Sequence, residues 1–150
     1  MIRLLKGPLV LALSALTSAC VVEIGSSNND DDILDYVFEE SSKEEVLDPS
    51  SKYDFTLMGG SNKITLKGNI GKILITGSYN YVIIEEDTHI EKLSITGLHN
   101  ILAQEDDLSL YIETLELVGD NNFVSISEYK QLIDTGEDNQ VLGTEAGLSF

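Results

Sequence analysis

Between residues 55 and 143, apolar residues alternate with polar ones in short stretches, and these stretches surround a recurring Gly-x-x-Asn segment. The segment occurs five times, and each time an apolar residue stands four positions before the glycine and two positions after the asparagine. Such alternation predicts β-strands with one buried face. Each repeat is therefore expected to contain a strand, a tight Gly-x-x-Asn corner, a second strand, a looser corner and a short third strand.

The spacing of the repeats predicts how these strands are arranged. Successive glycines of the segment are 18, 20, 22 and 17 residues apart, and a unit of about 20 residues cannot bury its own apolar face, so units must stack. Stacking equivalent strands in register, about 4.8 Å apart, gives a parallel β-solenoid. We therefore expect an all-β fold, a short parallel β-solenoid of about five coils over residues 53–150. An antiparallel sandwich with Gly-Asn hairpin turns is the alternative, but it does not explain five aligned units.

The glycine and the asparagine of each segment have separate expected roles at the corner. Glycine provides a backbone conformation that is closed to other residues. The asparagine amide can hydrogen-bond to equivalent amides in a stack, as in cross-β assemblies. The expected structural corner ladder consists of Gly59 and Asn62, Gly77 and Asn80, Gly97 and Asn100, Gly119 and Asn122, and Gly136 and Asn139.

These repeats resemble a family of bacterial domains of unknown function that are built from short Gly-x-x-Asn-x-Val repeats. The resemblance covers about residues 55 to 143. It implies a β-solenoid of the kind common in secreted proteins and lipoproteins, and it supplies no catalytic residues.

The N-terminal 20 residues have a different character. Arg3 and Lys6 precede an apolar run, residues 9–16, that is too short to span a bilayer as a helix, so residues 1–19 are interpreted as a signal peptide. The segment Leu-Thr-Ser-Ala-Cys that ends at Cys20 resembles the lipobox of bacterial lipoproteins, which implies acylation of Cys20 and a lipid-anchored place in the cell envelope. Since Val21 is not the aspartate associated with inner-membrane retention, the outer membrane is expected where the host has one. An ordinary secretory signal is the alternative.

Residues 20–52 are expected to form an acidic tether. Apolar residues at Ile33, Leu34, Val37 and Phe38 have helical spacing, which predicts a short capping helix over residues 31–47 that ends before Pro49. This helix is expected to cover either the first coil or an apolar surface of the solenoid.

That surface is predicted from the strand alternation. Tyr81, Ile83, Ile101 and Phe123 fall at outward positions on neighbouring coils, and an exposed apolar group of this size indicates a contact surface. We expect it to bind a protein or glycan partner in the envelope, unless the chain covers it with its own N-terminal segment.

Two acidic loops are expected to lie next to each other on adjacent coils. Six carboxylates would gather there, from Glu85, Glu86, Asp87, Glu105, Asp106 and Asp107. A hard cation such as calcium could bridge them, but a solvated acidic edge is the simpler interpretation.

Composition narrows the classes of function. The net charge of −17 argues against nucleic-acid binding, and a single cysteine excludes an internal disulfide. No catalytic motif, metal site or cofactor is indicated. The sequence therefore favours a non-enzymatic, lipid-anchored structural or protein-interaction module. A calcium- or glycan-binding adhesin-like module and a small glycan-active enzyme that uses the acidic loops are the alternatives.

Overall fold

The computed structural model describes residues 23–26, 33–85, 87–105 and 109–146. Within these ranges the chain forms strands and no helix. The strands are β1 (Glu23–Ser26), β2 (Leu34–Phe38), β3 (Glu44–Leu47), β4 (Tyr53–Gly60), β5 (Lys63–Leu66), β6 (Ile70–Ser78), β7 (Tyr81–Ile84), β8 (Thr88–Leu98), β9 (Ile101–Gln104), β10 (Leu110–Val118), β11 (Phe123–Asp134) and β12 (Gln140–Glu145).

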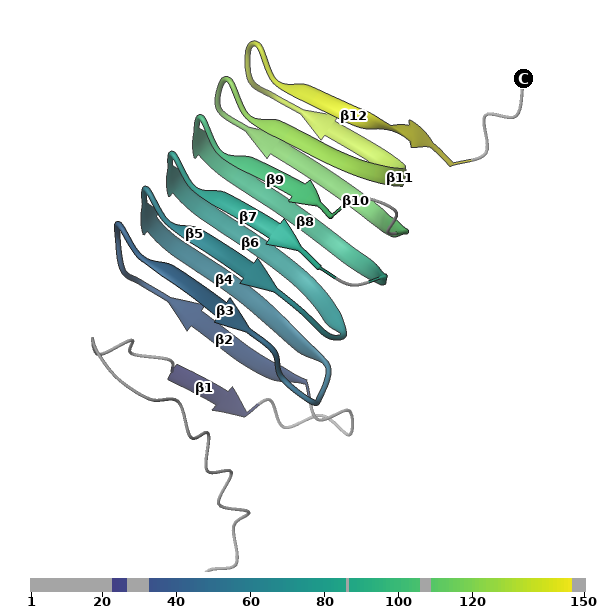
Figure 1. The fold of residues 1–150 in the computed structure, drawn as a ribbon. Coiled ribbons are helices and arrows are strands. Elements are labelled where there is room, and N and C mark those ends of the chain that lie inside the picture. The colour runs from purple at the N-terminus through teal and green to yellow at the C-terminus, as the bar shows by residue number, and fades with distance from the viewer. Residues whose placement is uncertain (1–22, 27–32, 86, 106–108, 147–150) are drawn as a thin grey trace, which may run out of the picture.

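The strands wind into a parallel β-solenoid of about six coils, which confirms the predicted fold class (Figure 1). Strands β2, β4, β6, β8, β10 and the second half of β11 pair in parallel and form what we call the long-strand wall. Strands β3, β5, β7, β9, the first half of β11 and β12 form the short-strand wall. Strand β1 pairs with β2 in the antiparallel sense.

Two edges join the walls. The Gly-x-x-Asn segments stack along one of them, which we call the corner edge, with Gly59, Gly77 and Gly97 in register on successive coils. The opposite edge, here called the loop edge, consists of the segments that lead from each short strand to the next long strand. Each coil therefore has one corner of constant length and one of variable length.

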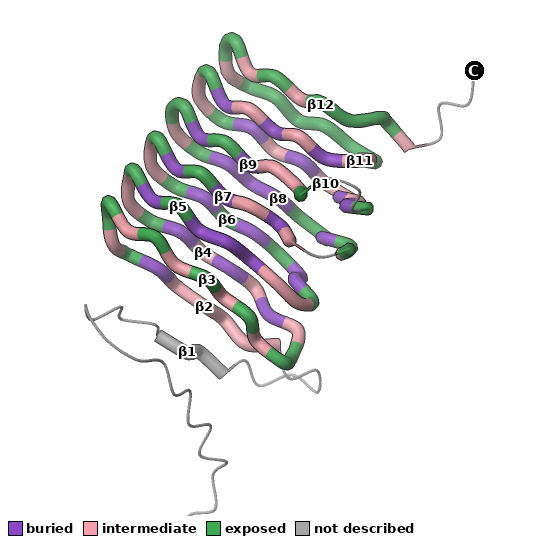
Figure 2. Tube along the Cα trace, viewed as in Figure 1, coloured by how far each residue is buried: buried purple, intermediate pink, exposed green. Residues whose placement is uncertain are grey.

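The core lies between the walls. Equivalent inward positions are apolar from coil to coil, as in the column Phe55, Ile73, Leu93 and Leu115, whose members are at most 1% exposed. Buried segments alternate with exposed ones along the strands (Figure 2). Burying each such side chain stabilises the fold by about 1.5–3 kcal/mol, so the stacked columns are the main source of stability.

The predicted capping helix over residues 31–47 is wrong. The described part of this segment forms β2 and β3, which make the first coil of the solenoid. Leu34, Tyr36 and Phe38 alternate toward the core, in register with Tyr53, Phe55 and Leu57. A short apolar run fits both periodicities, and here pairing with β4 selects the strand.

The first coil lacks the repeat signature for a steric reason. Glu40 stands at the glycine position and Lys43 at the asparagine position. A Cβ atom added to Gly59 would overlap with the carbonyl oxygen of Glu40, and one added to Gly97 would overlap in the same way with Gly77. Because the steric demand comes from the preceding coil, and Glu40 has no preceding Gly-x-x-Asn corner, a side chain is tolerated there.

The corner asparagines form a continuous hydrogen-bonded ladder. Asn100, which is fully buried, donates from Nδ2 to the Gly77 carbonyl at 2.9 Å and to Asn122 Oδ1 at 3.1 Å. Its Oδ1 accepts from the backbone N and from Nδ2 of Asn80, at 3.2 and 3.0 Å. The same set recurs at Asn80 and Asn122, whereas Oδ1 of Asn62 accepts from the backbone N of Lys43, which has no side-chain amide. The Asn100 amide therefore bonds to two backbone groups of the preceding coil, and its Nδ2 also bonds to the amide oxygen of the next coil.

The ladder ends at Asp134. Nδ2 of Asn139 donates to the Gly119 carbonyl and, at 2.7 Å, to the Asp134 carboxylate. That carboxylate also accepts from the backbone N of Gly136 at 3.1 Å. Asp134, an acid at an otherwise apolar position of the repeat, thus replaces the amide oxygen that a further coil would supply.

Candidate functional site

The predicted outward apolar residues lie together on the short-strand wall. Tyr81, Ile101 and Phe123 are in register on β7, β9 and β11, and Ile83 is two residues beyond Tyr81 on β7. Tyr81 and Ile101 are 39% and 40% exposed, whereas Ile83 and Phe123 are half-buried. We call these four residues the apolar patch. Parallel pairing holds them on one flat, rigid surface.

The surroundings of the apolar patch are charged on two sides. Lys63 pairs with Glu44 next to the patch, and the hydrogen bond that Lys63 donates to Glu44 raises the pKa of Lys63. Lys67 pairs with Glu85 at 2.6 Å toward the loop edge, which raises the pKa of Lys67 in the same way. An apolar centre with a charged rim is the usual composition of a protein-binding surface.

The alternative that residues 31–47 cover the apolar patch does not fit the structure. The described residues of that segment, 33–47, lie in the first coil, as β2, β3 and their connection. In the part of the chain that the structure describes, Tyr81 and Ile101 remain exposed with every other segment in place.

The long-strand wall presents a different surface. It contains a shallow depression of about 300 Å³. The depression is lined by Asp35, Asp54, Phe55, Thr56, Lys72, Ile73, Leu74, Lys92 and Ser94. Its charges are largely paired, since Lys72 is 3.8 Å from Asp54 and Lys92 is 2.7 Å from Glu116.

Carboxyl groups around the depression differ in their protonation behaviour. Burial raises the pKa of Asp54, an effect that Lys72 partly offsets and that Asp35 and Glu91 reinforce. Hydrogen bonds from Lys92 and Ser94 lower the pKa of Glu116. The pair formed by Asp35 and Asp54 was missed by the sequence analysis because Asp35 had been assigned to a helix, although the two are in register on β2 and β4.

Two of the six acidic residues that a cation could bridge interact instead with other residues of the chain. Glu85 pairs with Lys67, Asp87 accepts a hydrogen bond from the backbone N of Ser109, and Glu105 is exposed. Glu86, Asp106 and Asp107 lie outside the described residues. Among the residues that the structure describes, no group of three or more His, Cys, Asp or Glu side chains is placed to hold a metal ion. Calcium binding stays a prediction that depends on the three remaining acids.

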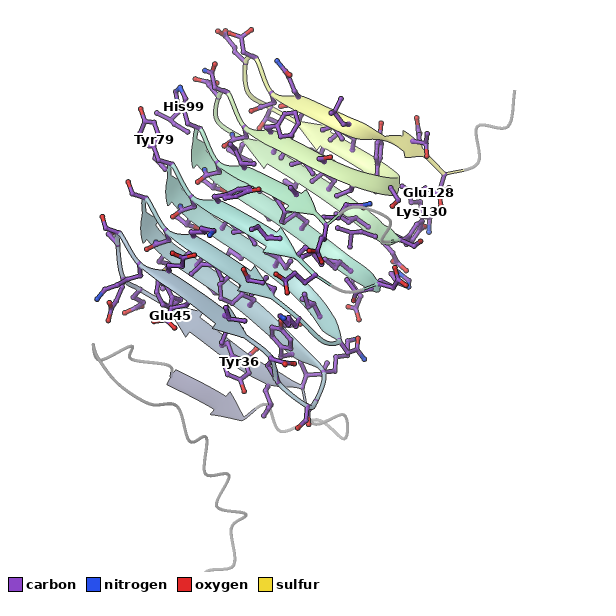
Figure 3. The ribbon with its side chains drawn as sticks, viewed as in Figure 1. Tyr36, Glu45, Tyr79, His99, Glu128 and Lys130 are labelled. Atoms are coloured by element: carbon purple, nitrogen blue, oxygen red, sulfur yellow. The ribbon has the colours of Figure 1, made fainter. Side chains whose placement is uncertain are left out.

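An aromatic stack on the corner edge was not predicted. The rings of Tyr79 and His99 stack with centroids 5.0 Å apart and an interplanar angle of 17°, and Figure 3 shows both side chains at this edge. Both residues have a positive φ, of 60° and 55°, just before the ladder asparagine. Strand alternation says nothing about side chains at such positions, so the sequence pattern gave no signal.

The lipid-attachment residue Cys20 and the signal peptide, residues 1–19, lie outside the described residues. In the ranges that the structure describes, no helix is long and apolar enough to cross a membrane.

One of the comparisons with known proteins found a match, to a family whose function is unknown. The profile of a family described as "Protein of unknown function (DUF3060)" matches residues 57–107, about a third of the chain. This region contains three of the five Gly-x-x-Asn corners. Searches of curated proteins and of solved structures found no match. Conclusions about function therefore depend on the geometry of this chain.

Proposed function

We propose that the protein is a non-enzymatic, lipid-anchored protein of the cell envelope, whose solenoid presents the apolar patch to a protein partner. One observation carries the proposal: Tyr81 and Ile101 are 39% and 40% exposed although they lie in register at the centre of a fully paired wall. Exposed apolar residues that form a contiguous patch mark interaction sites.

The rigidity of the wall supports binding. Each patch residue lies on a strand that is paired on both sides, so little conformational entropy is lost when a partner docks. Aromatic and aliphatic side chains at the centre of an interface typically provide most of the binding energy, about 2 kcal/mol or more for each dominant residue. With a net charge of −17, the protein favours a basic partner surface, which long-range attraction would guide toward it.

The anchor supplies the location in this proposal. Acylation of Cys20 would hold the chain at the membrane, and the acidic residues that follow would keep the solenoid away from anionic lipid. In a host with two membranes, the outer one is the proposed site.

A site-specific crosslinking experiment tests the apolar patch. A photo-crosslinking amino acid at position 101 should capture a defined envelope protein in cells, whereas the same amino acid at position 74 should not. Leu74 is a matched control because it is also apolar and 40% exposed, but lies on the long-strand wall. The double variant Tyr81→Asp, Ile101→Asp should abolish capture from another patch position, 123, with the thermal midpoint unchanged.

Two outcomes would contradict the proposal. Equal capture at positions 74 and 101 would show that the contact does not depend on the apolar patch. The second outcome has two parts: the double variant unfolds, and the single variant Ile101→Asp is captured from position 123 as efficiently as the parent. That result would show that the patch residues stabilise the fold and do not bind a partner.

A further inference from the structure

The C-terminal end of the solenoid exposes its last layer of core residues. Leu132 is in register with Leu115, which is fully buried, yet Leu132 is 39% exposed. Ile133 and Leu142, two apolar residues at outward positions of the same coil, are 37% and 57% exposed. No described strand pairs with the outer side of Gln131–Asp134 or of β12.

Backbone groups at this end point away from the molecule. Thr135 N donates to Leu117 O and Gln140 N donates to Asn122 O, both on the preceding coil. Because successive residues of a strand direct their N–H and C=O groups to opposite sides, Leu132 and Asp134 direct theirs outward, as does Val141. An open, apolar strand edge is a template for pairing with another chain.

The N-terminal end cannot be the complement of this edge. Stacking in the manner of the solenoid requires a glycine at the corner, because a Cβ there overlaps with the carbonyl oxygen of the coil before it. The first coil has Glu40 at that position, so the first coil of a second copy would clash with the Gly136 carbonyl. Head-to-tail growth into a filament is therefore blocked.

We propose that two copies of this chain pair tail to tail through their C-terminal coils, about a twofold axis, as a closed dimer. A partner must cover the edges of both walls and the core layer between them, and a second copy has the matching cross-section. Twofold symmetry makes both edge contacts antiparallel, and it closes the assembly at two copies. Pairing centred on Leu132 sets Lys130 of each copy opposite Asp134 of the other, and Figure 3 shows Lys130 at this end of the molecule.

Cysteine crosslinking tests this arrangement in the full chain. Every variant carries Cys20→Ser, so that the introduced thiol is the only one. With Leu132→Cys, mild oxidation should convert most of the protein to a disulfide-linked dimer on non-reducing gels, since the twofold axis brings the two thiols together. Leu74→Cys, with an equally exposed apolar position in the middle of the long-strand wall, should remain at least tenfold less crosslinked.

A second variant prevents the pairing between copies without removing a backbone hydrogen bond between the coils of one copy. Leu132→Pro deletes an N–H that points outward, a position where edge strands tolerate proline. Light scattering should show a dimer for the Cys20→Ser chain and at least a tenfold higher dissociation constant for Leu132→Pro, with the far-UV spectrum retained. Dimerisation should also strengthen with added salt, because each copy has a charge of −17.

The proposal is overturned by a monomeric mass at all concentrations, by equal crosslinking at positions 132 and 74, or by masses that grow beyond the dimer. A dimer that appears only after residues 147–150 are deleted would also overturn it, because the chain's own end would then be the native cover.

Discussion

The two edges of the solenoid solve the same geometric problem in different ways. On the corner edge, five coils turn with the same Gly-x-x-Asn segment, and buried amides connect each coil to the next. On the loop edge, the distance from the asparagine to the equivalent inward residue of the next long strand (Ile70, Ile90, Ile112 or Tyr129) is 8, 10, 12 or 7 residues, and half-buried ion pairs such as Lys67–Glu85 lie there. Length is therefore fixed where coils must bond to one another without water, and it varies where solvent can satisfy the polar groups.

The comparison predicts its largest effect at a corner glycine. Gly97→Ala places a Cβ against the Gly77 carbonyl at a residue whose φ is +136°, so the corner cannot close. We expect a loss of about 5 kcal/mol or more, which exceeds the usual range for one substitution. Urea unfolding followed by circular dichroism measures it.

Gly143→Ala is the control, because this glycine has no left-handed φ and an added Cβ would lie 3.1 Å from the side chain and the carbonyl oxygen of Ile126, a tight contact but not the overlap seen at Gly97. It should cost about 1 kcal/mol or less. Similar losses for the two variants would mean that close stacking at the corner does not limit stability.

The second-largest loss of stability is expected for the substitution of a ladder asparagine. Asn100→Ala leaves the backbone N and Nδ2 of Asn80 and the Gly77 carbonyl without their buried partners. Because each buried orphan costs about 1–3 kcal/mol, we expect a loss of about 4 kcal/mol in the same unfolding assay. Asn139→Ala, at the half-buried end of the ladder, should cost about 1 kcal/mol, and an equal loss at both sites would argue against burial as the cause.

The smallest effect is expected where the loop edge meets the long-strand wall. Because burial raises the pKa of Asp54 above its ordinary value of 3.8, the ionised form is disfavoured in the folded state. Asp54→Asn should therefore raise the thermal midpoint slightly at pH 7, and the difference should vanish below about pH 4 as the carboxyl protonates in both states.

Glu91→Gln should show the opposite sign. A hydrogen bond and the charge of Lys52 lower the pKa of Glu91 below its ordinary value of 4.5, so its stabilisation is present above that value and is lost as the pH falls through the folded pKa. The thermal midpoint of Glu91→Gln should therefore be slightly lower at pH 7 and equal to that of the parent in strong acid. Shifts of the same sign in both variants would contradict this account.

The repeat pattern predicted the coils that need glycine and asparagine, and it missed the one that does not. The neighbouring coils require glycine at position 97 and asparagine at position 100. Stacking therefore determines the residue type at these positions, and the sequence pattern reveals it. Glu40 and Lys43 have no earlier corner to accommodate, and the first coil therefore carries no signature. Its apolar residues also fit a helix, and only pairing with β4 decides between the two periodicities.

The candidate site was predictable to the extent that strand alternation determines it. Tyr81 and Ile101 face outward because they alternate with buried Val82 and Leu102. Alternation cannot place Tyr79 and His99, whose positive φ values lie outside strand geometry. It also could not bring Asp35 to Asp54, because their proximity depends on recognising the first coil.

The asparagine ladder gives the solenoid a dipole along its axis. Nδ2 of each of the first four ladder asparagines donates to the amide oxygen of the next coil, so the amide dipoles align along the axis with their positive end at Asn139. The negative carboxylate of Asp134 lies at that end, as acidic residues do at the start of a helix. Since each interior amide sees the same neighbours, a whole coil could be inserted or removed midway without altering either terminus. The number of coils is thus a free variable for evolution and for engineering.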